Sequence, residues 1–163
     1  MLICIATHFG LRFRSILIFL KELLMADEEN KTTDESETKK PEPPPAPVET
    51  HHTLTIDGQA LEYTATTGLM PMKNPETEEI EANIFFMAYT LDGVSNYAKR
   101  PVIFVFNGGP GSASVWLHMG GLGPKRVRME DDGWMPAPPY VMEDNAHTWL
   151  DMADLVFIDP VGT

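Results

Sequence analysis

Residues 101–114 constrain the fold of this chain more than any other stretch of the sequence. Val102–Phe106 is a run of five apolar residues, β-branched or aromatic, which is typical of a strand buried on both faces, as in a parallel sheet. Asn-Gly-Gly-Pro-Gly follows at 107–111, and its three glycines and proline end the strand in a tight loop. A short helix is predicted next, over residues 112–120, ended by a glycine pair. This order predicts backbone N–H donors at the carboxyl edge of an α/β sheet, where such sheets bind ligands.

The glycine-rich loop is compatible with more than one role. A dinucleotide-binding G-x-G-x-x-G is not met, because the run from Gly109 to Ser114 lacks the third glycine, and no Walker-type Gly-Lys-Ser/Thr is present in the chain. An oxyanion-binding loop needs free backbone N–H groups and no charged side chain, which the sequence satisfies. From the residues alone, an oxyanion loop and an ordinary strand-to-helix turn are equally good interpretations.

Two sequence blocks in a fixed order resemble the serine carboxypeptidases, the S10 peptidase family of α/β-hydrolases. The first is Asn-Gly-Gly-Pro-Gly at 107–111, directly after an apolar strand. The second is Asn-Ala-His-Thr-Trp at 145–149, followed by the predicted strand Asp154–Asp159 and by Pro-Val-Gly at 160–162; it is similar to the family's Asn-x-x-Ser-Trp block and its Asp-x-Pro-x-Gly strand end. The resemblance extends over residues 51–163. It implies the N-terminal part of an α/β-hydrolase sheet, in which an antiparallel hairpin leads into parallel strands.

The resemblance implies a serine-type carboxypeptidase, a hydrolase that removes C-terminal residues from peptides through an acyl-enzyme. It assigns the backbone N–H of Gly109 to the oxyanion hole, and the Asn107 side chain with the Gly108 N–H to the terminal carboxylate of the substrate. A G-x-S-x-G nucleophile elbow is absent from the sequence. In the family the elbow serine, the Asp and the His follow the strand that corresponds to Asp154–Asp159. We therefore expect the triad to be missing from this chain and the chain alone to be inactive.

Six other serines and histidines are interpreted as structural: His51, His52, Ser112, Ser114, His118 and His147. The two serines are small residues that allow close packing at the start of the predicted helix. The first two histidines lack a third ligand at metal spacing and are assigned to the start of a strand. We expect neither a metal nor another cofactor.

A β-hairpin is predicted over residues 53–66, because two alternating segments flank an Asp57-Gly58 turn. Residues 68–79 contain two prolines and are predicted as a loop, and Ile80–Leu91 as a longer strand. A short strand is predicted at 125–129 and a loop at 130–140.

One edge of the central strand is expected to be unpaired. In the sheet that the resemblance implies, Val102–Phe106 pairs with Asp154–Asp159 on one side and with a strand beyond Thr163 on the other. An unprotected apolar edge favours aggregation, so we expect the 163-residue chain to be poorly soluble without partners.

The chain divides into three parts by composition: residues 1–25, 26–50 and 51–163. The first part is apolar and has three interpretations: upstream sequence included by a wrong start, with Met25 as the true start; a signal or anchor; or an amphipathic helix. It is too short and too interrupted to span a bilayer. The second part, acidic and Pro-rich, is predicted to be a disordered linker. The third is the predicted hydrolase domain. A start at Met25 implies a cytoplasmic protein, and a signal implies a secreted or periplasmic one.

Net charge limits the classes of binding partner, and cysteine content limits the possible disulfides. The net charge of −12 argues against nucleic acid and anionic membranes as partners. The resemblance to the serine carboxypeptidases implies a peptide with a free C-terminal carboxylate as the partner. Cys4 is the single cysteine, so a disulfide within the chain is excluded. Ser112 stands where eukaryotic members of the family usually carry cysteine, which favours a bacterial-type member. The oligomeric state is not predicted.

Two other functions remain compatible with the sequence. One is a different α/β-hydrolase, such as an esterase or an aminopeptidase, that uses the same oxyanion loop. The other is a non-catalytic module that binds peptide C-termini. A glutamate immediately before an elbow serine would distinguish the carboxypeptidase from the other hydrolases.

Overall fold

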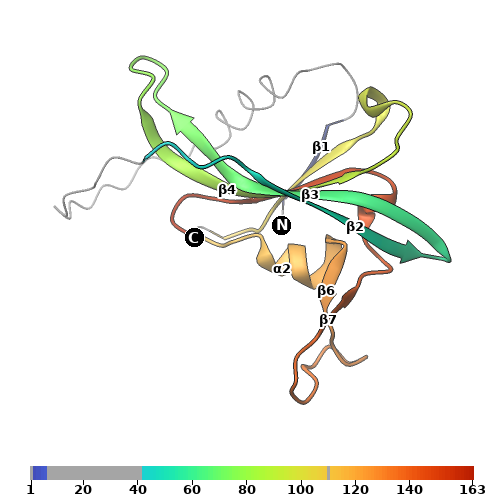
Figure 1. The fold of residues 1–163 in the computed structure, drawn as a ribbon. Coiled ribbons are helices and arrows are strands. Elements are labelled where there is room, and N and C mark those ends of the chain that lie inside the picture. The colour runs from blue at the N-terminus through green and yellow to red at the C-terminus, as the bar shows by residue number, and fades with distance from the viewer. Residues whose placement is uncertain (1, 7–41, 110) are drawn as a thin grey trace.

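A computed structural model describes residues 2–6, 42–109 and 111–163 of the chain (Figure 1). Its main feature is a six-stranded mixed sheet in the order β1-β5-β8-β4-β3-β2. The strands of this sheet are β1 (Leu2–Ala6), β2 (Val48–Ile56), β3 (Gln59–Lys73), β4 (Ile80–Leu91), β5 (Val102–Phe106) and β8 (Asp154–Asp159). Two short strands, β6 (Lys125–Val127) and β7 (Met142–Asp144), form a separate antiparallel pair.

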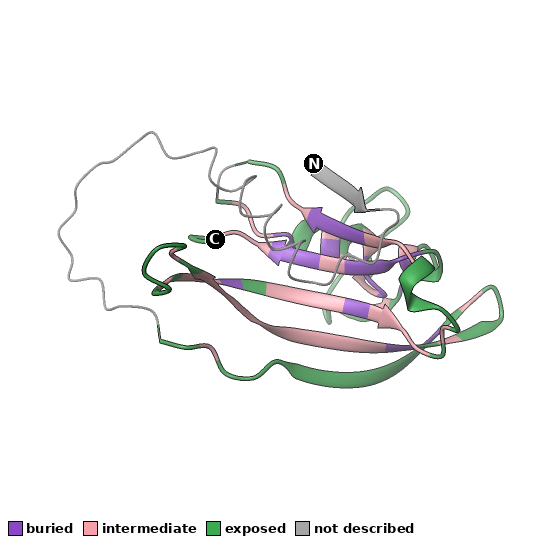
Figure 2. Cartoon of the chain, turned by 90° about the horizontal axis from the view of Figure 1, so that it is seen from above, coloured by how far each residue is buried: buried purple, intermediate pink, exposed green. Residues whose placement is uncertain are grey.

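The strands β5 and β8 lie side by side in parallel, in register from Val102↔Asp154 to Val105↔Phe157. Both contain residues that are almost fully buried, as the purple segments of Figure 2 show, and β8 pairs with β4 on its other side in antiparallel orientation. The parallel pair flanked by an antiparallel hairpin confirms the predicted α/β fold class and the predicted pairing of these two strands.

The predicted hairpin is present and is longer than the sequence indicated. Strands β2 and β3 meet at the two-residue turn Asp57-Gly58, whose φ angles of +49° and +79° match the primed turns that hairpins favour. The loop predicted for residues 68–79 is wrong in its first part, because β3 continues to Lys73. Here β4 supplies a partner for every residue from Gly68 to Met72, and this pairing outweighs the local preference of glycine and proline for a loop.

The expectation that one edge of β5 is unpaired is also wrong. Strand β1 pairs with β5 in antiparallel orientation, from Leu2↔Phe106 to Ala6↔Val102. This apolar segment satisfies backbone groups that β5 would otherwise leave open. The interpretations of residues 7–25 as upstream sequence, signal or helix lie outside the described residues, as does most of the predicted linker. Of that linker, residues 42–47 carry no helix or strand, and β2 begins at Val48.

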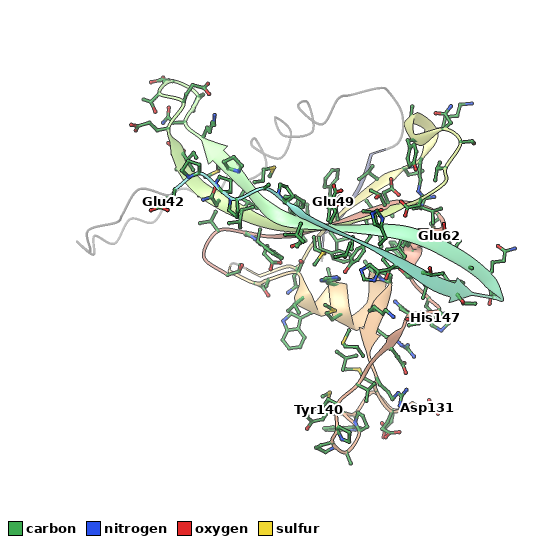
Figure 3. All side chains as sticks on the ribbon, viewed as in Figure 1. Glu42, Glu49, Glu62, Asp131, Tyr140 and His147 are labelled. Carbon is green, nitrogen blue, oxygen red and sulfur yellow. The ribbon has the colours of Figure 1, made fainter. Side chains whose placement is uncertain are left out.

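The connection after β5 contains a short helical segment and a projecting pair of strands. Helix α2 (Val115–Leu117) continues into a π-helical turn, η3 (His118–Leu122), so the helical segment runs through the glycine pair that was expected to end it. Strand β7, which the sequence analysis did not predict, pairs with β6, and Figure 3 places Asp131 and Tyr140 at the far end of this excursion. A 3-10 turn, η4 (Trp149–Asp151), precedes β8. None of the helices in the described part of the chain is long and apolar enough to cross a membrane.

An ion pair fixes the starting ends of β5 and β8. The Arg100 Nε donates to Asp154 Oδ1 at 2.7 Å, and a second guanidinium N–H donates to the Leu150 carbonyl. Asp154 Oδ1 also accepts the Leu91 N–H at 3.1 Å. Because the two charged side chains are only 9% and 12% exposed, each depends on the other for its hydrogen bonds. The pair therefore links the last residue of β4 to the starting ends of both parallel strands.

Removing one partner of this ion pair is expected to destabilise the fold strongly. Asp154→Leu leaves a buried guanidinium without its carboxylate, and we expect the free energy of unfolding in urea to fall by about 3–5 kcal/mol. The exposed pair Lys125–Asp144, 44% and 48% exposed, is the matched control, and Asp144→Ala is expected to cost less than about 1 kcal/mol. Equal losses in the two variants would contradict the structural role of the buried pair.

His118 lies in the core beneath the sheet and supports the structural interpretation of this residue. Its Nε2 is 2.6 Å from the Tyr89 hydroxyl, and its ring stacks on Phe157 with 4.4 Å between ring centroids. Only 8% of the residue is exposed. Burial lowers the pKa of His118 from 6.5 to about 4, although the nearby Asp159 carboxylate acts in the opposite direction. Burial also raises the pKa of Tyr89, with a smaller contribution from Tyr63, so both partners are neutral at pH 7.

This pKa difference predicts a pH-dependent stability. The unfolded chain binds a proton on His118 below about pH 6.5, whereas the folded chain does so only near pH 4, so protonation favours unfolding. As the pH falls from 6.5 to 4, the folded state should lose up to about 3 kcal/mol from this residue.

Urea unfolding at a series of pH values measures the effect. In His118→Gln this part of the pH dependence should disappear, and in His147→Gln, which changes an exposed histidine, it should remain. Identical pH profiles for His118→Gln and the unmodified chain would show that the buried ring does not titrate as described.

Candidate functional site

The glycine-rich loop leaves the sheet at the carboxyl end of the parallel strands. Its described residues are 107–109 and 111, called the glycine loop below. It follows the last residue of β5, and the segment after β8 emerges at the same edge because the two strands are parallel. The two segments approach each other closely: a Cβ atom on Gly111 would lie 3.9 Å from the Gly162 carbonyl oxygen. The loop therefore lies where the sequence predicted it.

The backbone of the glycine loop explains its composition. Gly109 and Gly111 have φ angles of +94° and +71°, a region that residues with a Cβ rarely adopt. A Cβ on Gly109 would meet no atom within 4 Å, so space lies open beside its backbone. Gly108 and Gly109 are exposed, and neither N–H donates a hydrogen bond to another described residue. Two backbone donors are thus available at this edge of the sheet.

The Asn107 side chain forms hydrogen bonds within the loop region. Its Nδ2 donates to Ser112 Oγ at 2.6 Å, and its only other described acceptor is the Gly108 carbonyl oxygen at 3.5 Å, the limit of a hydrogen bond. A primary amide has two N–H donors, so the second has at most this long contact within the described loop. Ser112 therefore has a hydrogen-bonding role beyond the small size predicted to matter at this position. An asparagine and a serine that flank a glycine turn are the signal that would have indicated it.

Asp159, which the sequence did not single out as a site residue, joins the loop region to β8 through Ser114. Ser114 donates both its backbone N–H and its hydroxyl to Asp159 Oδ1, each at 2.7 Å. Ser114 is 3% exposed and directly precedes α2. The available signal was an aspartate at the end of a buried strand that runs parallel to β5.

The second sequence block, at 145–149, is structural in this fold. The buried Asn145 amide donates to the Gly121 and Gly123 carbonyl oxygens at 2.6 and 2.8 Å. Thr148 Oγ1 donates to the Leu122 carbonyl oxygen at 2.6 Å. These side chains satisfy the carbonyl groups at the end of η3, which would otherwise lack partners. The block therefore holds the helical segment that follows the glycine loop.

The described residues contain no catalytic pair of serine and histidine. Ser114 Oγ is bonded to Asp159, and the His118 ring to Tyr89. His147 is exposed and is held only through its backbone N–H, which donates to Asn145 Oδ1. Within the same part of the chain, no group of three or more histidine, cysteine, aspartate or glutamate residues could hold a metal ion. What the site offers chemically is a set of neutral donors suited to a partial or full negative charge.

Comparison of the sequence with known proteins identifies a family to which this chain is similar. The family model described as serine carboxypeptidase, Peptidase_S10, matches residues 57–163. The pheromone-processing carboxypeptidase KEX1 of Saccharomyces cerevisiae is 29% identical over 100 residues, which cover 59% of this chain and 12% of that protein. The same enzyme of Komagataella phaffii is 28% identical over 99 residues, which cover 61% of this chain and 14% of that protein.

These alignments span only a small part of the relatives' length, and no solved structure matches the chain. The family model, however, covers both the glycine loop and the block at 145–149, and it extends over most of the chain. The chain therefore belongs to the serine carboxypeptidase family.

Proposed function

We propose that this chain carries the oxyanion-binding and carboxylate-binding half of a serine-type carboxypeptidase. The observation that carries the proposal is the pair of exposed glycines, Gly108 and Gly109, at the carboxyl edge of the parallel strands, whose N–H groups donate to no described residue. Membership of the serine carboxypeptidase family supports acyl transfer from a peptide as the reaction in which such donors act.

Gly109 is proposed to bind the oxyanion. When a nucleophile attacks the scissile carbonyl carbon, the carbonyl oxygen gains negative charge, and an N–H donor fixed beforehand lowers the barrier by about 2.7–4 kcal/mol. The positive φ of Gly109 and the open space where a Cβ would stand allow a carbonyl oxygen to approach this N–H. The sequence has no G-x-S-x-G elbow, so this chain by itself supplies no nucleophile of the expected kind.

Asn107 and Gly108 are proposed to bind the terminal carboxylate of the peptide. The Asn107 amide has an N–H left after its bond to Ser112, and the adjacent Gly108 N–H is exposed. Two neutral donors hold a carboxylate without introducing a positive charge beside the oxyanion donor. A carboxylate site separates a carboxypeptidase from an esterase or an aminopeptidase, which would use the oxyanion donor alone.

A non-catalytic module that binds peptide C-termini is the second candidate function. It is favoured by the lack of a serine–histidine hydrogen bond among the described residues. Such a module would use the same Asn107 and Gly108 donors and would need no oxyanion donor.

The carboxylate site predicts a preference for free peptide C-termini. A peptide and its C-terminal amide are titrated into the chain by calorimetry, and we expect the free acid to bind about 10–100-fold more tightly, the value of one charge-assisted hydrogen bond. Asn107→Asp places a negative charge in the site and should weaken binding of the acid while changing binding of the amide little.

The matched control is Asn96→Asp, which makes the same change in the connection that precedes β5, where the Asn96 Oδ1 accepts the Ala98 N–H within a 3-10 turn. This variant should bind both peptides as the unmodified chain does. Equal affinities of the unmodified chain for acid and amide would remove the carboxylate site from the proposal.

The chain alone is expected to be inactive. Incubated with a peptide, it should release no C-terminal residue above the uncatalysed rate, because the sequence has no nucleophile elbow and no serine is paired with a histidine in the described part of the chain. A fluorophosphonate probe, which labels activated serines, should also leave it unlabelled, as judged by mass spectrometry. Labelling of Ser112 or Ser114 would overturn this expectation.

A further inference from the structure

We propose that Asp159 is a positioning residue for the glycine loop, an inference that rests on the proposed function. Asp159 is the last residue of β8, and its Oδ1 accepts both the N–H and the hydroxyl of Ser114 at 2.7 Å. Ser114 is 3% exposed, so water competes little for these donors. The two bonds join the far end of the loop region to the end of the neighbouring strand.

Among the described residues, no other side-chain hydrogen bond joins the loop region to a segment outside it. Within 107–109 and 111–114, the remaining side-chain bonds run from Asn107 to Ser112 and to Gly108, inside the loop itself. The Ser114 carbonyl oxygen accepts only from the helical segment that follows, at Leu117 and His118. The loop is therefore held at one end by the pairing of β5 with its neighbours β1 and β8, and at the other by Asp159, the last residue of β8.

This attachment matters because the loop cannot be held by side-chain packing. Glycines have the largest backbone freedom, and three of them in one loop make many conformations accessible unless the ends are fixed. Oxyanion donors lower a barrier only when they are oriented before the reaction. By fixing the far end of the loop region, while strand pairing fixes the near end, Asp159 keeps the Gly108 and Gly109 donors directed at one place.

The charge of Asp159 and its hydrogen bonds to Ser114 should have opposite effects on carboxylate binding. Variants can therefore separate the two effects. Asp159 forms no ion pair with a described residue, and its carboxylate lies beside a site proposed to bind anions. By charge alone, its removal should strengthen binding of a carboxylate. By attachment, removal of its acceptor oxygen should weaken that binding. Asp159→Asn removes the charge and keeps an acceptor oxygen, whereas Asp159→Leu has a similar shape and removes both.

The test that needs no ligand measures the order of the loop. Backbone ¹⁵N relaxation gives order parameters for the amides of Gly108, Gly109 and Gly111 in the full chain. We expect values of about 0.85 in the unmodified chain and in Asp159→Asn, and below about 0.6 in Asp159→Leu. Gly58, in the turn between β2 and β3, serves as the internal control and should keep its value. Unchanged loop values in Asp159→Leu, or an equal fall at Gly58, would overturn the proposal.

The second measurement uses the peptide and its C-terminal amide. Asp159→Asn should keep or increase the preference for the free acid, and Asp159→Leu should reduce it by about tenfold. Full preference in Asp159→Leu would overturn the proposal. If Asp159→Leu does not fold, Ser114→Ala, which removes one of the two bonds, should give a smaller change in the same direction, and no change would count against the proposal. If the unmodified chain does not distinguish acid from amide, the proposed function fails, and the order parameters still decide the role of Asp159.

Discussion

The parallel pairing of β5 with β8 is the constraint on which the rest of the structure depends. Because both strands run in the same direction, their starting ends meet at the Arg100–Asp154 ion pair and their carboxyl ends meet at the glycine loop. Each end of β8 carries an aspartate whose oxygen accepts hydrogen bonds from a neighbouring segment. One strand thereby sets both the register of the sheet and the position of the loop. The site is a consequence of strand pairing, and the loop has no packed core of its own.

Local sequence patterns predicted those parts of the fold in which local and tertiary preferences agree. The apolar runs of β4, β5 and β8 are buried strands, and an Asp-Gly turn joins β2 to β3. The extension of β3 through Gly68 and Pro71 was missed because its cause is a partner strand that lies later in the sequence. The pairing of β1 with β5 was missed for a similar reason, since about a hundred residues separate the two strands and no local pattern encodes such a contact.

In the candidate site, too, local features were predicted from the sequence and contacts between distant segments were not. The sequence predicted where the loop lies and which residue types form it, because glycine conformation and strand ends are local properties. It did not predict that Ser112 braces Asn107 or that Asp159 holds Ser114, since both depend on which atoms the fold brings together. The block at 145–149 was informative as a family signature, and the structure gives it a physical role. Its asparagine and threonine complete the hydrogen bonding of the helical turn behind the loop.

Because β1 pairs with β5, the position of the start codon decides whether the sheet contains this strand. As the neighbour of β5, it forms part of the sheet and is not an appendage to it. A polypeptide whose translation begins at Met25 has a sheet that is one strand narrower, with the entirely apolar strand β5 at its edge. Any sequence fused ahead of Leu2 is attached directly to a strand that touches the parallel pair. Residues 2–6 therefore contribute to the architecture of the sheet, and an expression tag placed directly before them is a change made beside β5, three of whose residues are buried.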